Sequence, residues 1–181
     1  MPVAVALPDG LAPEIEVRLC ISHPRQREFI ISTAKRKIVR AGRRAGKTLG
    51  AAILAVEAFV AGKRVLYAAP TVEQVGKFWY EVTTALAAGI QYGLWKKNES
   101  EMFVELPGTE QRIKAKTAWN PDTLRGDYAG LLILDEWQLM DEDTWSVVGA
   151  PMLLDNNGDA VFIYTPPSLR SAGVSKAHDP R

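Results

Sequence analysis

Short apolar runs alternate with longer helical segments along this chain. The runs are rich in β-branched and aromatic residues, and their length suits the strands of a buried sheet. They lie at residues 37–41, 64–69, 131–134 and 160–164. We interpret 37–41 as the first core strand, and 131–134, an uninterrupted apolar run, as a central strand buried on both faces. Between these strands, the Ala-rich segment 48–61 and the segment 71–88 predict helices.

Shorter elements complete the predicted outline. The segments 102–106 and 111–117 flank Pro107-Gly108-Thr109 and predict a β-hairpin. Residues 24–31 predict a short helix with proline in its first turn, and 141–149 a further helix. Strands that alternate with helices predict an α/β fold, with a mostly parallel sheet covered by helices on both faces. In such sheets the ligand lies at the carboxyl ends of the strands.

The junction between strand 37–41 and helix 48–61 carries the strongest chemical signal. Gly46-Lys47-Thr48 opens the helix as in a phosphate-binding P-loop, although Ala41 stands where the usual pattern has its first glycine. Lys47 can reach the β- and γ-phosphates, and the Thr48 hydroxyl can bind Mg²⁺. The alternative is a chance Gly-Lys-Thr in a basic loop. The expected nucleotide-binding residues of the loop are Ala41, Gly42, Arg43, Arg44, Ala45, Gly46, Lys47 and Thr48.

Two carboxylates directly follow strand 131–134. We expect Asp135 to hold Mg²⁺ beside Thr48, and Glu136 to polarise the attacking water of an ATP hydrolase. The plain alternative is an apolar strand that returns to solvent, but the P-loop upstream favours catalysis. Thr165 ends the last strand and could sense the γ-phosphate, although composition alone favours a simple strand end before proline.

Composition limits the class of protein. The 181 residues are 47% hydrophobic and 24% charged, which suits one globular domain with its own core. The net charge of +1 gives no global sign of nucleic-acid binding, and the basic cluster at 25–47 is as readily a solvated face as a binding patch. Cys20 is the only cysteine, which suits a reducing cytoplasm. No apolar run reaches membrane-spanning length.

Taken in order, these motifs resemble the N-terminal ATPase domain of the large terminase subunit of tailed bacteriophages. The loop 42–48, with its arginines ahead of Gly-Lys-Thr, and the Asp135-Glu136 pair carry most of the resemblance. The other matching segments are His23–Phe29, Tyr67–Thr71 with Gln74, Leu124–Gly126 and Thr165-Pro166. The resemblance implies a P-loop NTPase fold of the ASCE/RecA-like type and explains the alanine at the head of the loop.

The resemblance also implies roles for single residues. Gln26 would read the adenine base, and Thr165 would belong to a coupling motif. Arg43 resembles an arginine that acts within its own subunit, and Arg125 one that reaches the nucleotide of a neighbouring subunit. The expected catalytic residues are therefore Glu136, Lys47, Arg43 and Arg125, and the expected metal ligands are Thr48 and Asp135.

A wider set of expectations follows from the family. Its members use ATP and Mg²⁺ to drive double-stranded DNA into a procapsid. They act as a ring, usually a pentamer, that docks on the portal protein and works with the small terminase subunit. The protein of this chain would accordingly act in the host cytoplasm, without a membrane.

The same resemblance divides the chain. We expect an N-terminal arm at 1–21, a P-loop ATPase domain at 22–170, and a tail at 171–181 that leads towards an RNase H-like nuclease domain absent from this sequence. Nuclease activity is therefore not expected from the 181 residues.

Three other interpretations stay open on the residues alone. They are a helicase-like DNA translocase, a small P-loop kinase, which should lack the Asp135-Glu136 pair, and a remnant that binds nucleotide without motor activity. Four of the five tryptophans could contact DNA or bases, but packing is the more common use of this side chain. These are Trp79, Trp119, Trp137 and Trp145.

Overall fold

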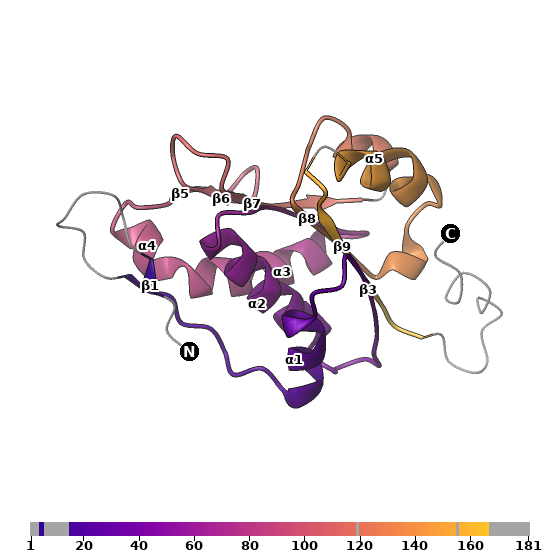
Figure 1. The fold of residues 1–181 in the computed structure, drawn as a ribbon, viewed down its shortest axis with the longest axis horizontal. Helices are drawn as coiled ribbons and strands as arrows, with labels where there is room; N and C mark the ends of the chain where they lie inside the picture. Colours follow the sequence, from indigo (N-terminus) through magenta and orange to yellow (C-terminus); the bar gives the residue numbers. More distant parts are fainter. Residues whose placement is uncertain (1–3, 6–14, 119, 155, 167–181) are drawn as a thin grey trace.

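The computed structural model describes residues 4–5, 15–118, 120–154 and 156–166, and shows one seven-stranded sheet between two layers of helices (Figure 1). The strands of this sheet are β3 (Arg36–Arg40), β4 (Arg64–Ala69), β5 (Lys96–Asn98), β6 (Phe103–Glu105), β7 (Arg112–Thr117), β8 (Leu131–Asp135) and β9 (Asp159–Tyr164). Their order in the sheet is β3-β9-β8-β4-β7-β6-β5. The first five in this order run parallel, and β6 and β5 are antiparallel.

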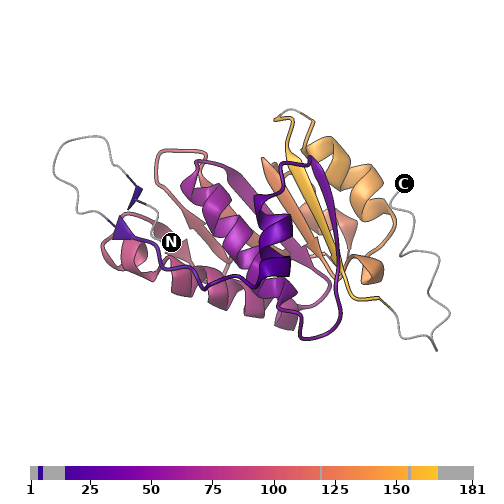
Figure 2. The same ribbon diagram turned by 60° about the horizontal axis from the view of Figure 1, so that its bottom comes forward.

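Helices cover both faces, as predicted (Figure 2). One face is covered by α1 (Pro24–Ile31), α2 (Lys47–Val60), α3 (Val72–Ala85) and α4 (Ala87–Gln91). The other is covered by the 3₁₀ turns η1 (Pro121–Leu124) and η2 (Trp137–Leu139), the π-helix η3 (Thr144–Gly149) and α5 (Ala150–Met152). The sheet is therefore buried on both sides at its centre.

Strand β4 shows how the sequence produces this double burial. Val65 and Tyr67 point into the core beneath α2 and α3, while Leu66 and Ala68 point into the opposite core. Successive side chains of a strand face opposite sides of the sheet. Because helices cover both sides, all four side chains are buried. Double burial explains why the central strands β4, β8 and β9 are almost continuous apolar runs. It also confirms 131–134 as a central strand, between β9 and β4.

The prediction for 37–41 was wrong in one respect. The segment is a strand, but β3 lies at the edge of the sheet rather than within the core. The exposed fraction of Ile38 is 53%, and Arg36 and Arg40 are exposed as well. Strand β3 pairs with β9, with Ile38 opposite Phe162. Its β-branched residues predict a strand in either place, so they cannot distinguish a central strand from an edge strand.

The hairpin prediction is confirmed by β6 and β7, which pair antiparallel around Gly108. Strand β5 was missed, because Lys96-Lys97-Asn98 is polar and has no apolar alternation. The helix at 24–31 is confirmed, and helix 71–88 is found as α3 followed by α4. Thr71 caps α3 through a capping box with Gln74.

Part of the predicted arm packs on the domain. Strand β1 (Ala4–Val5) pairs with β2 (Ile15–Glu16), which packs against α4, and the side chains of Ile15 and Val17 are buried. The rest of the arm, the tail at 171–181 and Trp119 lie outside the described residues. Within the described ranges, no helix is long and apolar enough to cross a membrane.

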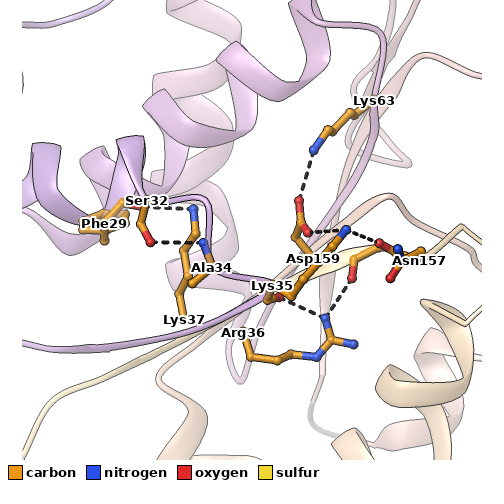
Figure 3. Close-up of polar contacts among 10 residues, drawn as sticks. Phe29, Ser32, Ala34, Lys35, Arg36, Lys37, Lys63, Asn157 and Asp159 are labelled. Atoms are coloured by element: carbon orange, nitrogen blue, oxygen red, sulfur yellow. Dashed lines mark hydrogen bonds and ion pairs between the residues drawn. The ribbon is translucent and has the colours of Figure 1, made fainter.

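A group of charged residues ties the strands together at the end of the sheet where β3, β4 and β9 begin (Figure 3). The Asp159 carboxylate lies 3.2 Å from Lys35 Nζ and 3.0 Å from Lys63 Nζ, and Arg36 donates to the Gly158 carbonyl. Burial by itself raises the pKa of Asp159, but the pairs with Lys63 and Lys35 outweigh it, so this pKa lies below its usual value. This group lies at the opposite end of the strands from the predicted P-loop.

Candidate active site

The carboxyl ends of β3, β9 and β8 meet at one edge of the sheet and bring the predicted site together. The loop from Ala41 to Gly46 leaves β3 and enters α2. Gly46 has a φ of +70°, and a Cβ at this position would clash with the Gln26 side-chain nitrogen. The left-handed backbone therefore favours glycine here, and a side chain at this position would also displace the Gln26 amide that donates to the Gly46 carbonyl.

Lys47 is the first residue of α2, and its side chain turns back over the loop. Its ammonium group donates to the carbonyls of Ala41 and Gly42, both at 3.1 Å, and to the Thr165 hydroxyl at 2.9 Å. The exposed fraction of Lys47 is only 8%. The three bonds use the full donor capacity of an ammonium group, so each N–H donor of this buried group has an acceptor.

Thr48 and Asp135 lie side by side, as the metal prediction requires. The Thr48 hydroxyl is 3.3 Å from Asp135 Oδ2, and the Tyr67 hydroxyl donates to the same oxygen at 2.8 Å. Burial raises the pKa of Asp135, against the Tyr67 hydrogen bond, which lowers it. Burial, together with the neighbouring Asp135, likewise raises the pKa of Tyr67. Sequence reasoning missed Tyr67 in this role, because only the pairing of β4 with β8 brings it to Asp135.

Hydroxyl and carboxylate oxygens are the ligand type that Mg²⁺ prefers. Among the described residues, no group of three or more His, Cys, Asp or Glu side chains could hold a metal ion. Mg²⁺ at a nucleotide site keeps several waters and takes further ligands from phosphate, so it needs few protein side chains. Thr48 and Asp135 therefore fit a magnesium ion that arrives with its nucleotide.

The Thr165 hydroxyl connects Glu136 to Lys47 by two hydrogen bonds. The Thr165 hydroxyl is 2.9 Å from Glu136 Oε1, and Gln138 Nε2 donates to Glu136 Oε2. Because an ammonium group can only donate, the Thr165 hydroxyl accepts from Lys47 and donates to Glu136. The backbone of Glu136 is left-handed, with a φ of +52°, which is unusual outside glycine and asparagine. Neither this conformation nor Gln138 was anticipated from the sequence.

A cleft of about 1000 Å³ opens beside the loop, between α1 and the exposed edge of β3. Gln26 lies in its wall, and both ends of its amide are engaged: Nε2 donates to the Gly46 carbonyl at 2.7 Å, and Oε1 accepts from the His23 N–H at 2.6 Å. In this arrangement Gln26 ties α1 to the loop. Arg44, with a φ of +63°, also lines the cleft, and Arg43 is exposed on the loop.

Arg125 forms an ion pair with Asp122 and has no hydrogen bond to the described residues of the Lys47, Thr165 and Glu136 network. It follows η1, its side chain is 63% exposed, and it forms an ion pair with Asp122 at 2.6 Å. Among the tryptophans, Trp79 is buried in the core, while Trp137 and Trp145 pack edge-on against Phe162. Packing is therefore confirmed for these three side chains.

Known proteins similar to this chain include several large terminases of bacteriophages. No protein-family model matches the chain. The large terminase subunit of Thermus virus P23-45 is 30% identical over 156 residues, which cover 76% of this chain and 32% of that protein. The ATPase domain of the large terminase of Thermus phage P74-26 has 27% identity and a TM-score of 0.70, covering 83% of this chain and 67% of that one.

A more distant structural likeness is the large terminase of a thermophilic bacteriophage, solved in complex with ATP-gamma-S. Its identity is 15% and its TM-score 0.54, with 78% of this chain and 37% of that chain covered. The chain spans about a third of the length of the curated relatives it matches. The chain is therefore a homologue of phage large terminase subunits, and its fold is that of their ATPase domain.

Proposed function

We propose that this chain is an ATP-hydrolysing motor domain whose hydrolysis drives double-stranded DNA into a procapsid. The observation that carries the proposal is the convergence of Lys47, Thr48, Asp135 and Glu136 at the carboxyl ends of neighbouring strands, in one network that the bond from the Glu136 N–H to Asp135 Oδ1 completes. This is where a parallel sheet binds its ligand. The likeness to terminase ATPase domains supports the same assignment.

The proposed division of labour follows from the chemistry of each group. The backbone N–H groups at the start of α2, together with Lys47, bind the phosphates. Thr48 and Asp135 hold Mg²⁺, which when bound neutralises phosphate charge. Glu136 accepts a proton from the attacking water, and its carboxylate is already oriented by the Thr165 hydroxyl. Thr165 thereby links phosphate binding at Lys47 to the base.

The cleft beside α1 is the proposed place of the adenine base. It adjoins the P-loop, and Gln26 lies in its wall. To read the base, the Gln26 amide would have to give up its hydrogen bond with the Gly46 carbonyl or with the His23 N–H and bind the edge of the adenine instead. The thermophilic phage terminase in complex with ATP-gamma-S supports a nucleotide ligand for the shared fold.

Two arginines are proposed to meet the negative charge that develops at the γ-phosphate. Arg43, exposed on the loop, would act within its own subunit. Arg125, exposed and paired with the nearby Asp122, would act on a neighbouring subunit of the ring. An arginine finger contributes about 10³–10⁵ in rate.

The remaining biology is proposed on the family likeness. The partners would be double-stranded DNA, the portal protein, the small terminase subunit and further copies in a pentameric ring, all in the host cytoplasm. Residues 22–170 would form the ATPase domain, with 1–21 as an arm and 171–181 leading towards the nuclease domain.

The proposal is tested in two steps with the purified chain. The first is the affinity for ATP-γ-S with Mg²⁺, measured by calorimetry; no binding would contradict the site assignment. The second is phosphate release from ATP with and without linear double-stranded DNA, compared with Glu136→Gln. We expect release that DNA stimulates and that Glu136→Gln abolishes. Transfer of phosphate to a small acceptor, with no release to water, would instead indicate a kinase.

A further inference from the structure

Gln138 adjoins the proposed base but belongs to none of the motifs that predicted the site. It lies in η2, two residues beyond Glu136, and its side-chain nitrogen donates to Glu136 Oε2. The other carboxylate oxygen, Oε1, accepts from Thr165. The Glu136 carboxylate is therefore held at both oxygens, by donors from two different parts of the fold.

The orientation of the Gln138 amide follows from this contact. A carboxylate accepts hydrogen bonds and cannot donate them, so the amide must present its nitrogen to Glu136. Its oxygen is then buried without a hydrogen-bond partner among the described residues. A buried acceptor without a partner is unfavourable. The Gln138 amide thus makes its hydrogen bond to the Glu136 carboxylate while its own oxygen stays without a partner among the described residues.

The two donors differ in what happens when phosphate binds. Thr165 also accepts from Lys47, and the proposed phosphate ligand competes for the same ammonium donors. Its bond to Glu136 is therefore coupled to the nucleotide. The bond from Gln138 to Glu136 runs within one short turn and does not pass through Lys47 or the loop. Gln138 can therefore hold the base while Thr165 changes partner.

The backbone conformation of Glu136 indicates why the hydrogen bond from Gln138 matters. This left-handed conformation is sparsely populated for a residue with a Cβ, and the Glu136 side chain reaches from the end of β8 to Thr165, just after β9. A long side chain on such a backbone needs external contacts to keep one position. We propose that Gln138 is a positioning residue for hydrolysis, which fixes the Glu136 carboxylate where it activates water. This inference rests on the proposed function.

The test compares two glutamines that each donate a side-chain hydrogen bond. Gln138→Met keeps the length of the side chain and removes the donor. Gln111→Met is the matched control, because half-buried Gln111 Nε2 donates to the Phe59 carbonyl at 2.6 Å, at the C-terminal end of α2 and away from the site. We expect Gln138→Met to lower kcat about 10- to 100-fold, as for a misplaced catalytic group, with the Kd for ATP-γ-S unchanged within about twofold. Gln111→Met should leave kcat unchanged.

A merely structural role would lower the thermal midpoint of both variants alike and weaken nucleotide binding together with turnover. The inference is overturned if Gln138→Met keeps kcat within about twofold of the wild type, or if Gln111→Met loses as much. Absence of turnover in the wild type would instead contradict the proposed hydrolase. In that case the NMR chemical shift of the Gln138 side-chain amide tests the contact with Glu136. We expect this shift to change in Glu136→Ala, and an unchanged shift would overturn the contact.

Discussion

The Lys47 ammonium group lies 2.9 Å from the Thr165 hydroxyl, although the two residues are 118 positions apart. One opens the helix after the P-loop, and the other follows the end of β9. The contact makes the phosphate-binding lysine and the proposed base Glu136 neighbours through a single hydroxyl group. A ligand that draws on Lys47 therefore acts directly on the hydrogen bonding of the base.

Replacement of Lys47 tests the phosphate site. Lys47→Ala should weaken ATP-γ-S binding about 100-fold or more, because a buried charge-assisted contact to phosphate is lost. Binding is measured by calorimetry, with Lys77→Ala as the control, since Lys77 is exposed on α3 and paired with Glu73 away from the site. Normal ATP hydrolysis in Lys47→Ala would contradict the site assignment.

Replacement of Glu136 separates binding from chemistry. Glu136→Gln should bind ATP with an affinity close to that of the wild type and lose about 10²–10⁴ in kcat, the usual contribution of a general base. The measurement is phosphate release at saturating ATP, alongside the Kd for ATP-γ-S. Weak binding in this variant would indicate a structural role for Glu136.

The Thr165 hydroxyl is tested with two variants, one without and one with a hydroxyl group. Thr165→Val loses the bonds to both Lys47 and Glu136, whereas Thr165→Ser retains a hydroxyl group. We expect Thr165→Val to lower kcat about tenfold or more, as one misplaced contact at a site can do, and Thr165→Ser to recover most of it. Equal turnover in the two variants would show that the hydroxyl has no part in hydrolysis.

Arg125 is tested by mixing subunits. If it acts on a neighbouring nucleotide, subunits with Arg125→Ala and subunits with Glu136→Ala should together recover hydrolysis that neither shows alone, because a mixed interface joins one intact site to one intact finger. The measurement is ATP turnover against mixing ratio in the assembled protein. An absence of recovery at every ratio would count against action between subunits.

The ion pairs of Asp159 predict a pH dependence of stability. Its pKa in the folded chain lies below the usual value, so its contribution is present above the unfolded pKa near 3.8 and is lost as the pH falls through the folded pKa. Asp159→Asn should therefore cost about 0.5–1 kcal/mol at pH 7, a magnitude reduced by solvent screening, and less as the pH falls.

Urea denaturation at pH 7 and at lower pH measures this difference. Asp122→Asn is the control, because its carboxylate is exposed and pairs with the equally exposed Arg125. High salt should shrink the Asp159 effect as it screens the pairs with Lys35 and Lys63. A cost that is the same at every pH would show that Asp159 stabilises the fold by packing instead.

Local features of the chain were predictable where a short stretch contains its own physical cause. The glycine at 46, the lysine at 47 and the acids after an apolar strand can each be recognised within a few residues of sequence. Thr71 and Gln74 likewise form their capping box locally. The edge position of β3, the left-handed backbone of Glu136 and the polar strand β5 were missed, because each depends on what the rest of the chain places beside it.

By itself, the sequence determined the α/β architecture, the P-loop and the carboxylates expected to serve it. Only the tertiary structure decided that β9 lies between β3 and β8, and so placed Thr165 between Lys47 and Glu136. It also brought Tyr67 to Asp135, across the pairing of β4 with β8. The physical reason is that strand order follows from burying both faces of the sheet over the whole chain, and no local pattern contains that information.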